Sequence, residues 1–171
     1  MHEIIEAWRR LSHLANLSLK RELVDLSKIV RACASEFMQD LPQRRLEFTI
    51  QPGVRTIGDA TLLEIALSNL LANAVKFSRE RDYTYIKFGT CDRNGETTCF
   101  LRDNGAGFDM AGSERMFRPF QRLHDRAEFP GKGLGLTTVR SIVNRHGGRV
   151  CAEGEVDKGA TIYLTLWPCL T

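Results

Sequence analysis

The amino-acid sequence predicts a two-layer α/β sandwich, in which three helices cover one face of a mixed β-sheet and a separate helix leads into the domain. Two observations support this fold class. Apolar residues recur at helical spacing in several long segments, and shorter segments of alternating polarity are separated by turn sequences. The length of 171 residues also suits a single domain with a sizeable core.

In the first half of the chain, the leading helix is expected from about residue 3 to 19, where apolar residues lie on one face and need a partner. The sequence "ELVDL" that follows is predicted to be extended. Ser27 is expected to cap a second helix, which runs to about Asp40 and is stopped by Pro42. "RLEFTIQPG" alternates as a strand that ends in a Pro-Gly turn.

The strongest helical pattern covers about Ala60 to Phe77, with Asp59 as its N-cap. "YTYIKFGT" and "TTCFLRD" then predict two strands joined by a turn at Asn94-Gly95. Residues 104–132 are rich in Gly, Arg and Phe but have little periodicity. A helix is expected over residues 134–145, and "GGRVCAEGE" and "GATIYLTLW" predict a last pair of strands.

Composition argues for an ordinary globular protein, with 43% hydrophobic and 26% charged residues. The net charge of +3 is too small to indicate a nucleic-acid partner, and we expect none. The five cysteines form no Cys-x-x-Cys pair, so neither a zinc site nor a disulfide framework is expected. No apolar run is expected to span a bilayer. We expect a cytoplasmic location, with any membrane anchor of the full-length protein upstream.

Asn69, Asn73 and Lys76 share one face of the 60–77 helix, at the edge of its apolar stripe. Asn is a poor residue for a helix interior, so two of them need an explanation. An Asn oxygen can bind Mg²⁺, and a Lys one turn on can meet a phosphate. A merely solvated polar face is the alternative.

Asp103 follows a predicted strand and precedes Gly105 and Gly107 in "RDNGAGFDM". A buried carboxylate here could accept a hydrogen bond from the amine of adenine, while glycines let a flat base approach the backbone. An ordinary Asp-Asn-Gly turn is the other interpretation of the same residues.

"PGKGLGLTTV" places Gly131, Gly133 and Gly135 directly before a helix. Free N–H groups and the helix dipole make such a position an anion site. A dinucleotide-binding fingerprint needs a preceding buried strand, a Walker loop needs its Lys elsewhere, and the companion motifs of protein kinases are missing. The glycines therefore indicate a phosphate site of another kind.

Four stretches in this order resemble the boxes of sensor histidine kinases: "NLLANAVKFS", "DNGAGF", "MFRPFQRLH" and "GKGLGL" resemble the N, first glycine, phenylalanine and second glycine boxes. The likeness covers about Leu46 to Leu166. It implies a Bergerat ATP-binding fold for residues 25–171, with a lid at about 109–132. Residues 1–24 resemble the end of the second dimerisation helix and its linker.

The resemblance assigns roles in binding ATP and Mg²⁺. Asn73 would hold the metal, Asn69 and Lys76 would lie near it and the phosphates, and Phe77 would border the base and ribose. Asp103, Gly105 and Gly107 would form the adenine pocket. The phosphates would be cradled by Gly131, Lys132, Gly133, Leu134, Gly135 and Leu136.

Met116, Phe117 and Phe120 would anchor the lid by burial, and Arg122 is the best match to an arginine that contacts phosphate in the family. Such a cation stabilises the transferring phosphoryl group, so Arg122 and Asn69 are the expected catalytic residues. Lys132 departs from the small or hydroxyl residue that is common between these glycines.

None of the four histidines lies in the family's phosphoacceptor context; His13 is expected on the surface of a helix bundle, and His124 and His146 look structural. The resemblance therefore implies transfer of the γ-phosphoryl group of ATP to a histidine on a dimerisation helix outside this chain. It also implies a homodimer in the full-length protein, an upstream sensory domain and a downstream response regulator.

Two other functions stay open. The related topoisomerase, chaperone and mismatch-repair domains hydrolyse ATP with a glutamate one turn before the Mg²⁺-binding Asn. This chain has Asn69 there, which cannot act as a general base, so the residue favours transfer over a stand-alone ATPase. A nucleotide-sensing interaction module is the third possibility.

Overall fold

The computed structural model of the chain describes residues 18–121, 133–166 and 169–170. Its main sheet has five strands in the order β2-β4-β5-β7-β6. β2 runs parallel to β4 and every other neighbouring pair is antiparallel, so the sheet is mixed, as predicted. The strands are β2 (Leu46–Ile50), β4 (Thr84–Arg93), β5 (Glu96–Asp103), β6 (Arg149–Glu155) and β7 (Gly159–Thr165).

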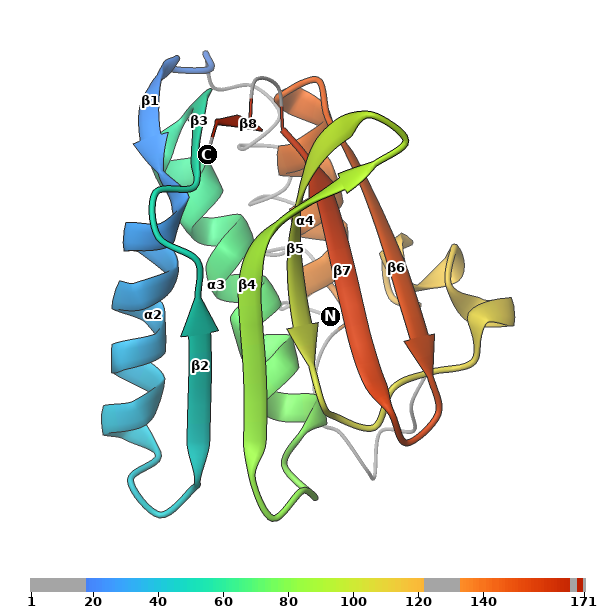
Figure 1. Cartoon of the computed structure of the whole chain (residues 1–171). Helices are drawn as coiled ribbons and strands as arrows, with labels where there is room; N and C mark the ends of the chain where they lie inside the picture. The colour runs from blue at the N-terminus through green and yellow to red at the C-terminus, as the bar shows by residue number, and fades with distance from the viewer. Residues whose placement is uncertain (1–17, 122–132, 167–168, 171) are drawn as a thin grey trace, which may run out of the picture.

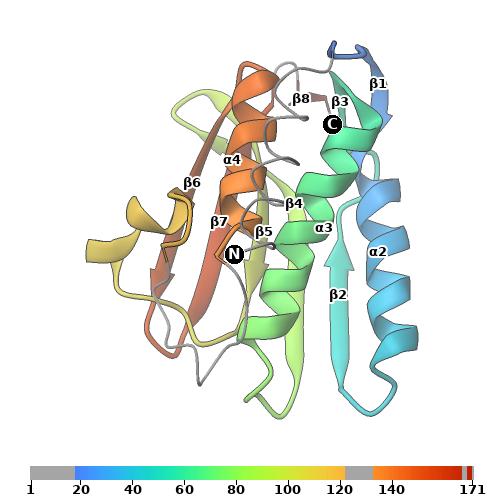
Figure 2. The same cartoon turned by 180° about the vertical axis from the view of Figure 1, so that it is seen from behind.

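The three α-helices of the described residues lie on one face of this sheet: Figure 1 shows the sheet in front of them, and Figure 2 shows them in front of the sheet. They are α2 (Leu26–Asp40), α3 (Ala60–Phe77) and α4 (Gly135–Arg145). The buried leucines of α3 join the inward residues of β4, β5 and β7 in one hydrophobic core. The two-layer α/β sandwich is therefore confirmed, while the expected leading helix falls mainly on residues 1–17, outside the described part.

The central helix α3 has the predicted bounds and the predicted cap, because the Asp59 side chain accepts a hydrogen bond from the amide of Leu62. It is the one described helix whose length and composition would also allow a membrane span, although no such segment was expected. Eight of its residues are buried, and they pack in the core against the sheet. Burial inside the domain accounts for its apolar character.

Helix α2 begins two residues earlier than expected, because its N-cap is Asp25 instead of Ser27. The Asp25 carboxylate accepts from the amide of Lys28 at 2.9 Å. The buried Ser27 hydroxyl instead donates to the carbonyl of Gln51 and accepts from the amide of Val54. Ser27 therefore fastens the helix to the turn after β2.

The described residues also form a second, small sheet that was not expected. β1 (Glu22–Asp25), the segment predicted to be extended, pairs with β3 (Arg55–Gly58), which in turn pairs with β8 (Cys169–Leu170). β3 and β8 were not predicted, because strands this short carry no clear alternation. The pairing attaches the segment assigned to the linker, residues 22–24, to the strand that leads directly into α3.

The β4–β5 hairpin turns at Asn94 and Gly95, as predicted, and both residues have the positive φ values (57° and 81°) of the favoured two-residue turn. Along β5, alternate side chains face the helices, so Asp103 is on the same face as the buried Cys99 and Leu101. β7 ends at Thr165, two residues before the predicted strand end. The sheet thus delivers the Asp103 carboxylate to the helical layer.

His146 is buried, as expected for a structural histidine. Its Nε2 accepts a hydrogen bond from the amide of Asp59 at 3.0 Å, and its Nδ1 lies 2.7 Å from the carbonyl of Ile142. This arrangement requires a neutral ring with the proton on Nδ1. His146 therefore joins the end of α4 to the start of α3.

Candidate functional site

The polar face of α3 meets the N-terminus of α4. A Cβ atom on Gly135 would lie 3.1 Å from Oδ1 of Asn69 and 3.6 Å from Nδ2 of Asn73. The Asn69 amide donates to the carbonyl of Ile65 at 2.8 Å, which leaves its oxygen toward Gly135. The structure therefore brings together the two carboxamides and the glycine-rich helix start that the sequence singled out.

Among the described residues, no side chain caps the start of helix α4. Gly133 has a φ of +70°, and its successor Leu134 is the N-cap residue but offers no side-chain hydrogen bond. The amides of the first turn therefore have no capping side chain in the described part of the chain, an arrangement that favours an anion. Leu136 packs against the core and holds this turn in place.

Lys76 and Phe77 lie at the other end of the same face. The Lys76 ammonium is 4.2 Å from the centroid of the Phe77 ring, and both residues are half-buried. The cation–π contact keeps the long lysine side chain close to the end of α3.

Asp103 is a buried carboxylate at the end of β5, with 7% of its surface exposed. Its Oδ1 accepts a hydrogen bond from the amide of Gly105 at 2.8 Å. Burial raises the pKa of Asp103 to about 6, although the hydrogen bonds from the amides of Gly105 and Ala160 act in the opposite direction. An acceptor of this kind suits the recognition of a neutral N–H donor.

Gly105 and Gly107 are needed for close packing. A Cβ atom on Gly105 would lie 2.6 Å from the Phe77 carbonyl oxygen and 2.8 Å from Oδ1 of Asp103. Gly107 has a φ of +65°, and a Cβ atom there would lie 1.9 Å from the carbonyl oxygen of Glu155. Gly105 therefore packs the loop after β5 against the end of α3, whereas Gly107 packs on the turn between β6 and β7.

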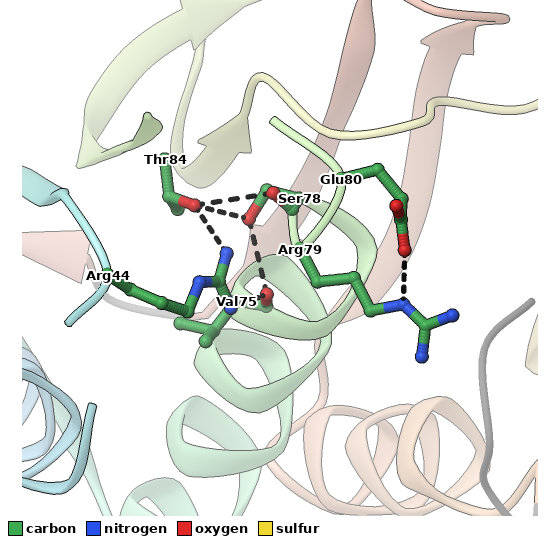
Figure 3. A network of polar contacts seen from close by, with 6 residues as sticks. All are labelled: Arg44, Val75, Ser78, Arg79, Glu80 and Thr84. Atoms are coloured by element: carbon green, nitrogen blue, oxygen red, sulfur yellow. Dashed lines mark hydrogen bonds and ion pairs between the residues drawn. The ribbon is translucent and has the colours of Figure 1, made fainter. Parts of the chain in front are cut away.

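The end of α3 is fixed by a polar network that the sequence did not reveal (Figure 3). Arg44 donates to the carbonyl of Val75 at 2.8 Å and to the hydroxyl of Thr84 at 2.6 Å. The Ser78 hydroxyl bonds to the carbonyl of Ala74, and Thr84 donates to Ser78. Burial lowers the pKa of Arg44. The network holds the last turn of α3, which carries the site residues 76 and 77.

The phenylalanine box is only partly buried. Phe117 is in the core and Met116 packs against it, as predicted. Phe120 is 43% exposed, which contradicts its expected burial, because its φ of +60° turns the chain and its amide bonds to the carbonyl of Gly133. The Thr137 hydroxyl donates to the carbonyl of Phe117 at 3.4 Å and links this box to α4.

Several predicted residues lie outside the described part of the chain, namely Gly131, Lys132, Arg122, His2, His13 and His124. Within residues 18–121, 133–166 and 169–170, no group of His, Cys, Asp or Glu side chains is arranged to hold a metal. The Asn73 carboxamide makes no hydrogen bond to another described residue. A metal held by one carboxamide together with phosphate oxygens therefore fits the donor set, since Mg²⁺ uses few protein ligands beside nucleotides.

The chain is similar to curated proteins that include a phytochrome and a histidine kinase. It is 31% identical over 166 residues to cyanobacterial phytochrome A of Nostoc sp. strain PCC 7120, covering 97% of this chain and 22% of the relative. It is 33% identical over 174 residues to the methanogenesis regulatory histidine kinase FilI of Methanothrix harundinacea, covering 95% and 19%. The chain thus spans about a fifth of the length of these curated relatives.

Solved structures show the same fold. The mycobacterial sensor histidine kinase MprB superposes with a TM-score of 0.70 at 25% identity, covering 85% of this chain and 96% of that one. Full-length ShkA in complex with AMPPNP gives a TM-score of 0.75 at 23% identity, covering 98% and 35%.

The model of one protein family matches residues 58–169, which include α3, the glycine boxes and α4. The match covers Asn69, Asn73, Lys76, Phe77, Asp103 and the start of α4. The chain therefore belongs to the family of histidine kinase-, DNA gyrase B- and HSP90-like ATPases.

Proposed function

We propose that this chain is the ATP-binding catalytic domain of a two-component sensor histidine kinase. The observation that carries the proposal is the meeting of Asn69 and Asn73 with the uncapped start of α4 at Gly135. Asp103 supplies a buried acceptor at the end of β5, where Gly105 joins it to the end of the same α3 helix. One end of this site suits phosphates, and the other suits a base that carries an amine.

The residue roles follow from these positions. Asn73 would hold Mg²⁺, which when bound would offset the negative charge of the phosphates. Lys76 and the amides of Gly133 to Leu136 would meet phosphate oxygens, while Phe77 would border the base. Asp103 would accept a hydrogen bond from the adenine amine, with Gly105 and Gly107 shaping the wall. Arg122 and Lys132 are proposed phosphate contacts on the sequence alone.

Transfer to histidine suits the residues better than hydrolysis does. A histidine ring nitrogen attacks the γ-phosphorus, the bond from that phosphorus to the bridging oxygen breaks, and ADP leaves. A neutral imidazole is already nucleophilic, whereas water needs a base. Asn69 has no basic atom, and its amide is bound to the carbonyl of Ile65.

We also propose partners and a location for the full-length protein. The relatives are sensor kinases, so a dimerisation helix that carries the histidine, a homodimer, an upstream sensory domain and a response regulator are the expected partners. We place the catalytic domain in residues 25–171 and the end of the dimerisation segment in 1–24, with a cytoplasmic location.

Calorimetry with a non-hydrolysable ATP analogue tests this function. Asn73→Ala is expected to lose the Mg²⁺-dependent part of the affinity, because it removes the carboxamide oxygen proposed to hold the metal. Asn144→Ala, on the exposed face of α4, is the matched control and should bind as the wild type does. Equal binding by wild type and Asn73→Ala, with and without Mg²⁺, would refute the metal assignment.

A further inference from the structure

Arg81, in the loop between α3 and β4, binds three main-chain carbonyls. Its Nε donates to Asn104 at 3.0 Å, and its Nη2 donates to Gly105 at 2.9 Å and to Asp157 at 2.7 Å. These carbonyls belong to the loop after β5 and to the turn between β6 and β7. One guanidinium therefore ties three separate connections of the fold together.

Gly105 is consequently bound on both sides. Its amide donates to the Asp103 carboxylate and its carbonyl accepts from Arg81. The next residue, Ala106, donates to the Phe77 carbonyl and accepts from the amide of Asp157. All four main-chain groups of these two residues are thus paired, and Arg81 supplies the partner on the side away from Asp103.

Asn104 completes the same loop. Its carbonyl accepts from Arg81, while its side chain accepts from the amide of Tyr85 and donates to the carbonyl of Tyr83. Only a planar guanidinium offers several N–H donors at fixed angles, so a lysine at this position could satisfy at most part of the set. Replacing Arg81 would release the loop whose amide orients the Asp103 carboxylate.

We propose that Arg81 is a positioning residue for base recognition: it holds Asn104 and Gly105 so that the Asp103 carboxylate is oriented toward the 6-amino group of adenine. This rests on the proposed function, in which Asp103 binds the adenine amine. Arg81 itself makes no contact with the nucleotide in this account. Its effect is therefore expected on the choice of base and not on the phosphates.

The test compares Arg81→Lys with wild type in binding two nucleotides, a non-hydrolysable ATP analogue and inosine triphosphate. Inosine carries a carbonyl oxygen where adenine carries its amine, so it cannot use the Asp103 acceptor. We expect Arg81→Lys to weaken binding of the ATP analogue about tenfold, as for loss of one charge-assisted hydrogen bond. Binding of inosine triphosphate should be nearly unchanged. The ratio of the two affinities therefore falls toward that of Asp103→Ala, which has no side-chain acceptor.

Two controls separate this role from general stability. Arg93→Lys removes guanidinium contacts to Glu153 and Tyr163 from an arginine that is equally exposed, 33% against 32%, and should keep the wild-type ratio. Asp157→Asn removes the 3.6 Å ion pair with Arg81 but keeps the carbonyl and tolerates the positive φ of residue 157. It should bind both nucleotides as wild type does.

The outcomes are distinct. If Arg81→Lys weakens binding of both nucleotides equally, the ratio of affinities is unchanged and the positioning role is overturned. A wild-type protein that does not prefer the ATP analogue over inosine triphosphate would instead refute the proposed function of Asp103. If Arg81→Lys melts below the working temperature, the ratio of the two affinities is measured for Arg81→Gln at a lower temperature. A lowered ratio supports the positioning role, and an unchanged ratio overturns it.

Discussion

Asn69 and Gly135 face each other so closely that a Cβ atom on residue 135 would lie 3.1 Å from Oδ1 of Asn69. The carboxamide cannot easily retreat, because its amide is hydrogen-bonded to the carbonyl of Ile65. This contact joins α3 to α4 at the point where the two sequence motifs for phosphate binding meet. Glycine at position 135 therefore leaves room for the Asn69 carboxamide beside the start of α4.

Gly135→Ala is expected to weaken binding of a non-hydrolysable ATP analogue several-fold without lowering the melting temperature. The added methyl group displaces the Asn69 carboxamide, while alanine at the first helical residue favours α4 by up to about 1 kcal/mol. Calorimetry and thermal melting measure the two effects. Ser141→Ala, a helix-favouring change within α4, should leave the affinity unchanged; equal affinity in both variants would contradict the account.

Asp103 should make stability depend on pH in an unusual direction. Burial raises its pKa from 3.8 to about 6, so the folded protein holds this proton more tightly than the unfolded chain does. Its contribution to stability is fully present below about pH 4 and is lost as the pH rises through about 6, a change of roughly 3 kcal/mol. Asp103→Asn has no such proton to lose.

The measurement is the melting temperature of wild type minus that of Asp103→Asn, from pH 4 to pH 8. We expect this difference to fall between pH 4 and 6 and then to level off. Asp82→Asn, in an exposed loop, controls for the loss of one surface charge. A difference that rises with pH would show that the folded protein favours the charged carboxylate.

Arg44→Ala is expected to destabilise the fold by about 1–3 kcal/mol, because it leaves the Val75 carbonyl and the Thr84 hydroxyl without their guanidinium donor. Denaturant unfolding measures the change. Arg31→Ala, on the exposed face of α2, is the control and should lie within about 0.5 kcal/mol of wild type. A loss no larger than that of the control would mean that water replaces Arg44 at the end of α3.

The sequence predicts most of the regular structure because its long elements carry strong periodicity. The α3 helix, its Asp59 cap and the Asn94-Gly95 turn follow from local patterns alone. The elements that were predicted wrongly depend instead on contacts between segments that are distant in the sequence. Ser27 looks like a cap but is buried against the 51–54 turn, and β3 exists only because β1 and β8 pair with it.

The site is predictable where a residue type is unusual for its position, as with two asparagines in a core helix. Arg44 and Arg81 could not be found in this way. Each is an ordinary arginine in a polar loop, and its role appears only when distant carbonyls are brought within 3 Å of the guanidinium. Phe120 was misjudged because its apolar character predicts burial, whereas its backbone places it partly in solvent.

Transfer of label from γ-labelled ATP tests the central proposal most directly. The purified chain is mixed with a separately prepared dimerisation segment that carries a histidine, and phosphohistidine and free phosphate are followed together. We predict acid-labile, base-stable label on the segment, formed much faster than free phosphate, because Asn69 provides no base for water. Rapid multiple-turnover release of phosphate by the chain alone, abolished by Asn73→Ala and without label on the segment, would contradict the proposal and show a stand-alone ATPase.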